Sequence, residues 1–92
     1  MTKKRVAFEV VNQRGFHARP ATLFVQCAEE FASSITVRNV ASDNKVDGKS
    51  VLSLLTLFAP KGSLLEVTAS GVDAEAAVRK LGALIMGGFD EE

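Results

Sequence analysis

The one histidine of the chain, His17, lies in a short segment with the sequence GFHARPA, residues 15–21. Imidazole can act as a neutral nucleophile or as a proton carrier near pH 7. The segment lies between a strand-like run and a helix-like run, and backbone N–H groups at a helix start are unpaired donors that favour an anion. Arg19 adds a planar, permanently charged group that suits phosphate. These residues have the ingredients to take and hold a phosphoryl group.

The helix start favours this chemistry in two ways. Its positive end opposes protonation of the imidazole, so more of the ring is a neutral nucleophile. After transfer, the backbone amides of Ala18 and Arg19 can bind the phosphate oxygens. The sequence contains no second histidine and no glycine-rich nucleotide cradle. The pattern predicts a phosphoryl carrier with His17 and Arg19 as catalytic residues, rather than an independent catalyst. A capping or surface histidine is the alternative that these residues alone leave open.

Length and composition restrict the class of protein. The 92 residues suffice for one small domain, and we expect residues 1–92 to form it. Eleven basic residues offset eleven acidic residues, which gives no case for a nucleic-acid partner. The longest apolar region, Val51 to Ala59, is too short to span a bilayer, and no signal peptide is evident. We therefore expect a cytoplasmic protein without direct membrane insertion. The lone Cys27 excludes an internal disulfide, and with one histidine we expect no metal and no cofactor.

Hydrophobic periodicity predicts the elements around the motif. They are strands at 4–11 (half-buried), 34–40, 45–47 and 64–70, and helices at 18–31, 50–58 and from 74 to the glycines at 87–88. Pro20 is tolerable only in the first turn of a helix, so it locates His17 at the helix N-terminus. Gly15 can take the positive φ of the turn before it. The order predicts an α+β fold, an antiparallel sheet with helices on one face, followed by a short acidic tail over 89–92.

Residues 15–21 resemble the active-site motif of the HPr family, the histidine-containing phosphocarriers of the bacterial phosphoenolpyruvate-dependent phosphotransferase system. Residues 48–52, with the sequence GKSVL, resemble the second signature of that family, and the resemblance covers nearly the whole chain. It implies that Enzyme I phosphorylates His17 at Nδ1 and that the group passes to an EIIA-type domain in sugar uptake. It also implies that Arg19 stabilises the phosphohistidine. The implied fold is an open-faced β-sandwich, a four-stranded antiparallel sheet covered on one face by three helices.

Ser50 has two predicted roles. Its position before an apolar run makes it a good N-cap for the short helix. The resemblance adds a regulatory role, since many family members carry a serine here that an ATP-dependent HPr kinase/phosphorylase phosphorylates. A phosphate at Ser50 would place about two negative charges beside the docking surface and oppose a partner of like charge.

The short helix has too many apolar residues to bury all of them against one sheet. We expect Leu54, Leu57 and Phe58 in the core. The resemblance implies contacts with Enzyme I and the EIIA acceptors in this region, through an exposed apolar patch near His17. The residues assigned to this docking patch are Phe16, Val51, Leu52 and Leu55. A small carrier that visits two partners through one face is expected to be a monomer.

Two further functions stay open. The ending GGFDEE resembles the nitrogen-related branch of the family, whose carrier relays phosphate to a regulatory acceptor. Residues 21–23 and the context of Lys49 and Ser50 instead resemble sugar-pathway or kinase-regulated members. The other alternative is a non-carrier regulatory protein that acts through Ser50 and uses the helix start only to bind an anion. Replacement of His17 by alanine separates a carrier from a non-carrier protein, because it should abolish phosphate transfer but leave simple partner binding largely intact.

Overall fold

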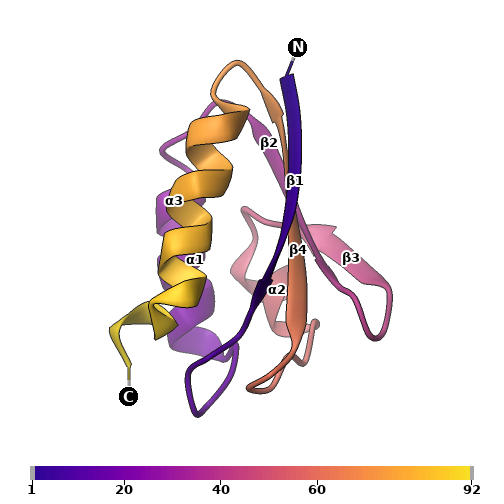
Figure 1. Cartoon of the computed structure of the whole chain (residues 1–92), viewed down its shortest axis with the longest axis vertical. Helices are drawn as coiled ribbons and strands as arrows, with labels where there is room; N and C mark the ends of the chain where they lie inside the picture. The colour runs from indigo at the N-terminus through magenta and orange to yellow at the C-terminus, as the bar shows by residue number, and fades with distance from the viewer. Residues whose placement is uncertain (1, 92) are drawn as a thin grey trace.

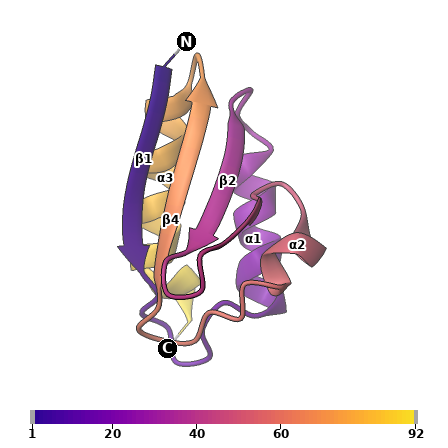
Figure 2. The ribbon, with the colours of Figure 1, turned by 90° about the vertical axis from the view of Figure 1, so that its right-hand side faces the viewer.

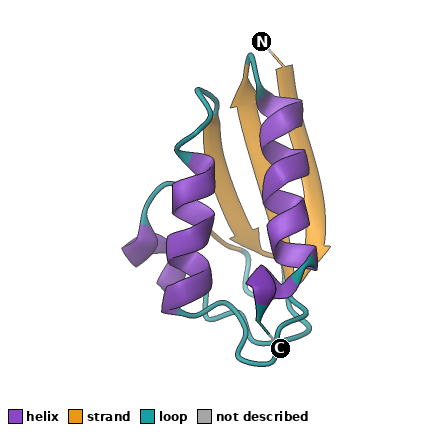
Figure 3. Ribbon diagram, turned by 90° about the vertical axis from the view of Figure 1, so that its left-hand side faces the viewer, coloured by secondary structure: helices purple, strands orange, loops and turns teal. Residues whose placement is uncertain are grey.

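The computed structural model describes residues 2–91 and has the element order that the sequence predicts. The elements are β1 (Thr2–Glu9), α1 (Ala18–Ala28), β2 (Ser34–Asn39), β3 (Asn44–Asp47), α2 (Val51–Leu55), β4 (Leu64–Gly71), α3 (Ala74–Met86) and the 3₁₀ turn η1 (Gly88–Asp90). Neighbouring strands pair antiparallel in the order β1-β4-β2-β3. The long helices α1 and α3 cover one face of this sheet (Figures 1 and 3). Figure 2 shows the opposite face without a helix over it in the described residues, which confirms the open-faced β-sandwich.

Alternation along the central strands separates the two layers. In β4, the side chains under the helices are those of Leu65, Val67 and Ala69, all buried. Glu66 and Thr68 lie half-exposed on the open face. β2 pairs with β4 in a register that continues the same alternation, so one face of both strands lines the core.

The first strand differs from the predicted half-buried strand over 4–11, because β1 is an edge strand with a single neighbour. Most of its side chains, including Val6, are exposed, and Val10 is buried only after the strand has ended. Phe8 is partly buried and packs against α3. A Cβ on Gly82 of α3 would lie 2.3 Å from the Phe8 ring, so the missing side chain is what lets the helix approach.

The helix that follows the histidine carries its apolar stripe against the sheet, with Phe24 and Cys27 buried. α1 ends at Ala28, before the predicted limit at Phe31, because the backbone after it forms a tighter turn in which N–H groups bond to carbonyls three residues earlier. The N–H of Phe31 donates to the Ala28 carbonyl (3.1 Å). Cys27 is a buried core residue, and its burial raises the pKa of the thiol. No helix in residues 2–91 is long and apolar enough to cross a membrane.

The short helix α2 ends at Leu55 rather than at the predicted Phe58. Leu54 and Leu57 are buried, as predicted. The prediction that Phe58 lies in the core is wrong, because its side chain is 82% exposed. Its φ of +47° puts the backbone in the left-handed region at this point. The Phe58 side chain therefore points to solvent, whereas that of its neighbour Leu57 lies in the core.

Asp73 occupies the position before α3, but its carboxylate makes no capping bond there. It accepts hydrogen bonds instead from the N–H of Ala32 (2.8 Å), the N–H of Ser33 (3.0 Å) and the hydroxyl of Ser33 (2.5 Å). Asp73 therefore links the start of α3 to the loop that leads into β2.

The predicted short acidic tail over 89–92 folds back onto the domain at residues 89–91. After α3, the turn η1 brings the chain back and buries Phe89. The Phe89 ring packs on the ring of Phe16, with 5.7 Å between centroids. Glu91 follows this buried anchor and is held beside the loop before α1. Glu92, the last residue of the predicted tail, lies outside the described residues.

Candidate functional site

His17 lies immediately before α1, in the position that Pro20 predicts. Its backbone is extended (φ −99°, ψ −164°), and its carbonyl accepts a hydrogen bond from the N–H of Ala21 (3.0 Å) at the start of the helix. The imidazole makes no capping bond, and 32% of the side chain is exposed. The ring is therefore available for chemistry, which removes the capping alternative.

The first turn of α1 presents unpaired backbone donors beside this ring. Within residues 2–91, the N–H groups of Ala18 and Arg19 have no protein acceptor, and Pro20 has no N–H. Both residues are exposed. The hydroxyl of Thr22 donates to the Ala18 carbonyl (2.9 Å), a bond within the helix that leaves the amides free. The positive end of α1 thus faces solvent next to His17, where an anion is favoured.

The loop before His17 is held against the turn that follows α2. Gly15 has a φ of +70°, as predicted, and a Cβ there would lie 2.6 Å from the carbonyl oxygen of Ala59. The N–H of Phe16 donates to the same oxygen (2.8 Å). This close approach brings the end of α2 beside the histidine.

Phe16 is a core residue rather than a surface residue. Its side chain is 5% exposed and packs edge-on against Phe24, with 5.9 Å between ring centroids, and against Phe89. The prediction that Phe16 is exposed is wrong, because its ring belongs to this aromatic cluster, and its contact with a partner stays a prediction. The ring instead anchors the backbone that carries His17.

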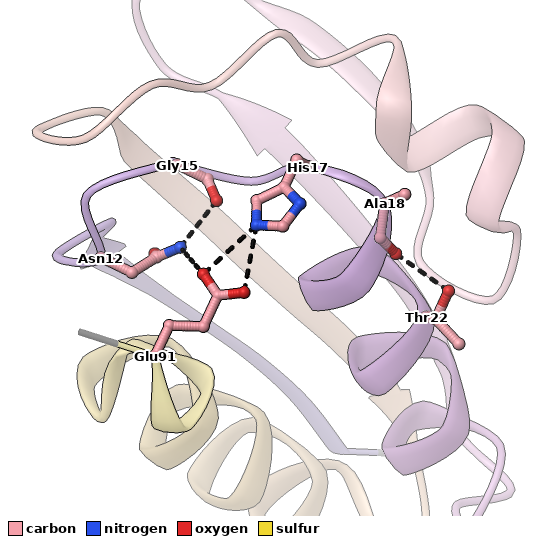
Figure 4. Close-up of polar contacts among 6 residues, drawn as sticks. All are labelled: Asn12, Gly15, His17, Ala18, Thr22 and Glu91. Atoms are coloured by element: carbon pink, nitrogen blue, oxygen red, sulfur yellow. Dashed lines mark hydrogen bonds and ion pairs between the residues drawn. The ribbon is translucent and has the colours of Figure 1, made fainter.

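The side chain held directly against the His17 ring comes from the other end of the chain. The Glu91 carboxylate oxygens lie 3.1 and 3.2 Å from Nε2 of His17 (Figure 4). The side-chain amide of Asn12 donates to the same carboxylate (2.9 Å) and to the carbonyl of Gly15 (2.7 Å). Asn12 therefore ties Glu91 to the loop that carries the histidine.

The surroundings of Glu91 favour its ionised form. The hydrogen bond from Asn12 is the main cause that lowers the pKa of Glu91 below its ordinary value, and His17 contributes less. An ionised carboxylate only accepts hydrogen bonds, so Nε2 of His17 carries the hydrogen that faces it. In the neutral ring the lone pair then lies on Nδ1, which points away from Glu91 in Figure 4. The contact thus favours the neutral tautomer that has its lone pair on Nδ1.

Asn12 and Glu91 are residues of the candidate site that the sequence does not predict. Glu91 lies 74 positions from His17, so no local spacing links them. One signal is present in the sequence. An aromatic residue at 89, directly after the glycines that stop α3, favours a return of the chain to the core over a solvated tail.

Two open depressions border the site. The polar one, of about 350 Å³, is lined by Gln13, Arg14, Arg19, Asp90 and Glu91. The more apolar one, of about 360 Å³, is lined by Arg14, Phe16, His17, Ala18, Leu55, Phe58, Ala59 and Pro60. Arg19 and Glu91 both line the first depression, and His17 and Leu55, at the end of α2, both line the second. In residues 2–91, no three or more His, Cys, Asp or Glu side chains come together as a metal site would require.

The docking residues predicted on α2 differ in exposure. Leu52 is 79% exposed, whereas Val51 and Leu55 are half-buried and pack against the core. Of these, Leu55 lines the apolar depression at His17. The strongly exposed aromatic residue in that depression is Phe58, which the sequence predicts to be core.

Ser50 lies directly before α2, and its predicted cap is confirmed. Its hydroxyl oxygen accepts a hydrogen bond from the N–H of Ser53 (3.2 Å). The residue is half-exposed. Ser50 thus caps α2 with a neutral, partly exposed hydroxyl group.

Comparison with known proteins gives this fold and site their class. Residues 4–86 match the family model described as the PTS HPr component phosphorylation site. The phosphocarrier protein HPr of Neisseria meningitidis is 39% identical over 85 residues, which are 92% of this chain and 93% of that protein. A crystal structure of HPr from Thermoanaerobacter tengcongensis has a TM-score of 0.90 and 40% identity, and the match covers 97% of this chain and 98% of that one.

A longer relative shows the same domain as part of a larger protein. The multiphosphoryl transfer protein of Escherichia coli O157:H7 is 40% identical over 85 residues, 91% of this chain but 23% of that protein. The fold and the matches define a phosphocarrier of the phosphotransferase system. The chain belongs to the HPr family.

Proposed function

We propose that the chain accepts a phosphoryl group from phospho-Enzyme I on Nδ1 of His17 and passes it to EIIA-type domains in sugar uptake. The observation that carries the proposal is the Glu91 carboxylate on Nε2, because it leaves Nδ1 as the unprotonated nitrogen of the neutral ring. The partial exposure of His17 at the start of α1 supports access by a partner. Membership of the HPr family supports the same reaction.

The proposed step needs no proton transfer at His17. The Nδ1 lone pair attacks phosphorus as the bond between phosphorus and the donor atom breaks, and the donor keeps the electron pair of that bond. The histidine keeps its hydrogen on Nε2, so the phosphorylated ring carries a positive charge. Glu91 lies against that hydrogen and stabilises the charge. Transfer to the acceptor reverses these changes.

The phosphate oxygens are proposed to bind at the first turn of α1. The unpaired N–H groups of Ala18 and Arg19 are the backbone donors, and the positive end of the helix favours the charge of the phosphate. The exposed guanidinium of Arg19 adds a forked donor that suits phosphate. Catalysis in this proposal is positioning and electrostatic stabilisation around one nucleophile.

The exposed part of α2 is proposed to dock the partners. Leu52 and the partly exposed Val51 and Leu55 form an apolar surface of the kind that protein partners cover. Ser50 precedes these residues and is proposed as the target of an HPr kinase/phosphorylase. A phosphate there would add about two negative charges to the docking surface and weaken the binding of an acidic partner.

Intact mass after incubation with Enzyme I and phosphoenolpyruvate tests the carrier function. We expect one added phosphate that is lost in acid and is absent in His17→Ala. The matched control is Val72→Ala, an exposed apolar residue between β4 and α3, which should be phosphorylated like the wild type. An acid-labile phosphate that persists in His17→Ala would contradict the proposal.

The same measurement separates the alternative functions. An acid-stable phosphate from HPr kinase and ATP, absent in Ser50→Ala and accompanied by no phosphate from Enzyme I, would indicate a regulatory protein that acts through Ser50. A phosphorylated chain that transfers to a nitrogen-regulatory acceptor, but not to a sugar-pathway EIIA, would belong to the nitrogen-related branch.

A further inference from the structure

Phe58 combines two features that the fold alone does not explain. It is a bulky residue in the left-handed region of the backbone (φ +47°), which is unfavourable for a side chain of this kind. Its ring is also 82% exposed in the turn after α2, so packing of the ring does little to offset the unfavourable backbone conformation. Phe89 provides the contrast: it has a similar φ of +55°, but its ring is fully buried against Phe16.

The backbone at Phe58 is held in this conformation from both sides. The carbonyl of Leu57 accepts a hydrogen bond from the buried side-chain amide of Asn39 (2.9 Å). The carbonyl of Ala59 accepts from the N–H of Phe16 (2.8 Å). Leu57 and Ala59 are themselves buried. The fold therefore requires a left-handed residue at 58, which glycine would satisfy without strain, and it does not require an aromatic ring.

The position of the ring relates it to the reacting atom. Phe58 lines the same depression as His17, together with Leu55 and Arg14. Phosphoryl transfer needs the reacting atoms within roughly 3–3.5 Å of each other. A protein that brings phosphorus to His17 must therefore cover this depression, and Phe58 lies in the covered area.

We propose that Phe58 is a docking anchor for the phosphoryl donor and inserts its ring into an apolar pocket of that protein. The proposal rests on the function proposed above and adds to it a residue that binds the donor. Buried aromatic anchors commonly dominate the binding energy of protein interfaces. Arg14, on the same depression, places a positive charge at the rim, so the pocket of the donor carries an acidic group at its edge.

Steady-state phosphorylation by Enzyme I and phosphoenolpyruvate, with the concentration of this chain varied, tests the anchor. Phe58→Gly should raise the KM for this chain about tenfold and leave kcat nearly unchanged, because the ring contributes to binding and not to chemistry. The melting temperature of Phe58→Gly should equal or exceed that of the wild type, because glycine relieves the strain at φ +47°.

Two further variants isolate the ring. Phe58→Ala keeps a Cβ in the strained backbone and should raise KM as much as Phe58→Gly does. Val72→Ala removes another strongly exposed apolar side chain (87%), at the far end of β4 from His17, and should leave KM unchanged.

Three outcomes would overturn the anchor. One is an unchanged KM in Phe58→Gly when the wild type accepts phosphate normally, which would leave the carrier function intact. Another is a lower melting temperature in Phe58→Gly with a matching loss of folded protein, which would make the ring structural. The third is a wild-type chain that accepts no phosphate, which would end the carrier proposal and the anchor with it.

Discussion

Two carboxylates at opposite ends of α3 make similar sets of hydrogen bonds for different purposes. Asp73, before the helix, accepts from two backbone N–H groups and the hydroxyl of Ser33. Glu91, beyond its other end, accepts from the side-chain amide of Asn12 and from the ring of His17. In both cases hydrogen bonding lowers the pKa of the carboxyl, chiefly through Ser33 for Asp73 and through Asn12 for Glu91.

The difference lies in what donates. The donors to Asp73 are two backbone N–H groups and a hydroxyl, none of which titrates near neutral pH. This carboxylate therefore only holds the loop before β2 against the start of α3. One donor to Glu91 is an imidazole whose second nitrogen is free to react. The same chemical group therefore joins two segments at one end of α3, and at the other end it favours one tautomer of the histidine that we propose to react.

Replacement of Asp73 should give the largest effect on stability. Asp73→Asn removes the charge that accepts three hydrogen bonds, and we expect the melting temperature at neutral pH to fall by several degrees. The rate of phosphorylation by Enzyme I should remain that of the wild type, because the link lies at the far end of α3. A variant with normal stability and slow phosphorylation would contradict the division between the two carboxylates.

The effect of Asp73→Asn should also depend on pH in a defined direction. A carboxyl with a lowered folded-state pKa stabilises the protein above its ordinary, unfolded-state pKa, and this stability is lost as the pH falls through the lowered value. The difference in melting temperature between wild type and variant should therefore be full at neutral pH and shrink in acid. Parallel stability curves down to strongly acidic pH would show that ionised Asp73 is not the source of the difference.

Replacement of Glu91 should affect chemistry more than stability. Glu91→Gln keeps the shape of the side chain but no longer requires a hydrogen on Nε2 of His17, so part of the neutral ring should adopt the other tautomer. We expect phosphorylation about fivefold slower, the equivalent of one lost hydrogen bond.

Nitrogen NMR of the His17 ring distinguishes this role from a structural one. The wild type should show a hydrogen on Nε2 at a pH where the ring is neutral, and Glu91→Gln should show a mixture of tautomers. Slow phosphorylation with an unchanged tautomer would make Glu91 a structural residue only.

The smallest effect is expected at Ser50, the N-cap of α2, where the accepting oxygen is neutral. Ser50→Ala should lower the free energy of unfolding by about 1 kcal/mol, because the N–H of Ser53 loses its acceptor. This loss should be the same at neutral and acidic pH, unlike that of Asp73→Asn. Urea unfolding at two pH values measures it, and a loss that vanishes in acid would contradict the assignment.

Local patterns predict the parts of this molecule that a single element determines. Pro20 locates the start of α1 because a proline fits only the first turn, and His17 follows from it. The alternation of β4 predicts its buried face because the period of a strand is two. Ser50 predicts its own cap, since the bond spans three residues.

The predictions that are wrong depend on a single backbone angle or on contacts between segments that are distant in the sequence. One positive φ at Phe58 takes the ring out of the core, although the run of apolar residues predicts burial. The packing of Phe16 on Phe89 joins residues from the two ends of the chain, and Glu91 reaches His17 only because of it. Periodicity within one element contains no information about such contacts.

The contact between Phe16 and Phe89 has a consequence for the dynamics of the protein. The turn that carries Glu91 is short and joins the core through the Phe89 ring, so it can open locally while the sheet and both long helices stay folded. Each such opening frees Nε2 of His17, so that Glu91 no longer holds a hydrogen on that nitrogen. Hydrogen exchange at the N–H of Glu91, which donates to the Gly88 carbonyl (2.9 Å), would therefore report the fraction of time for which the contact between Glu91 and His17 is broken.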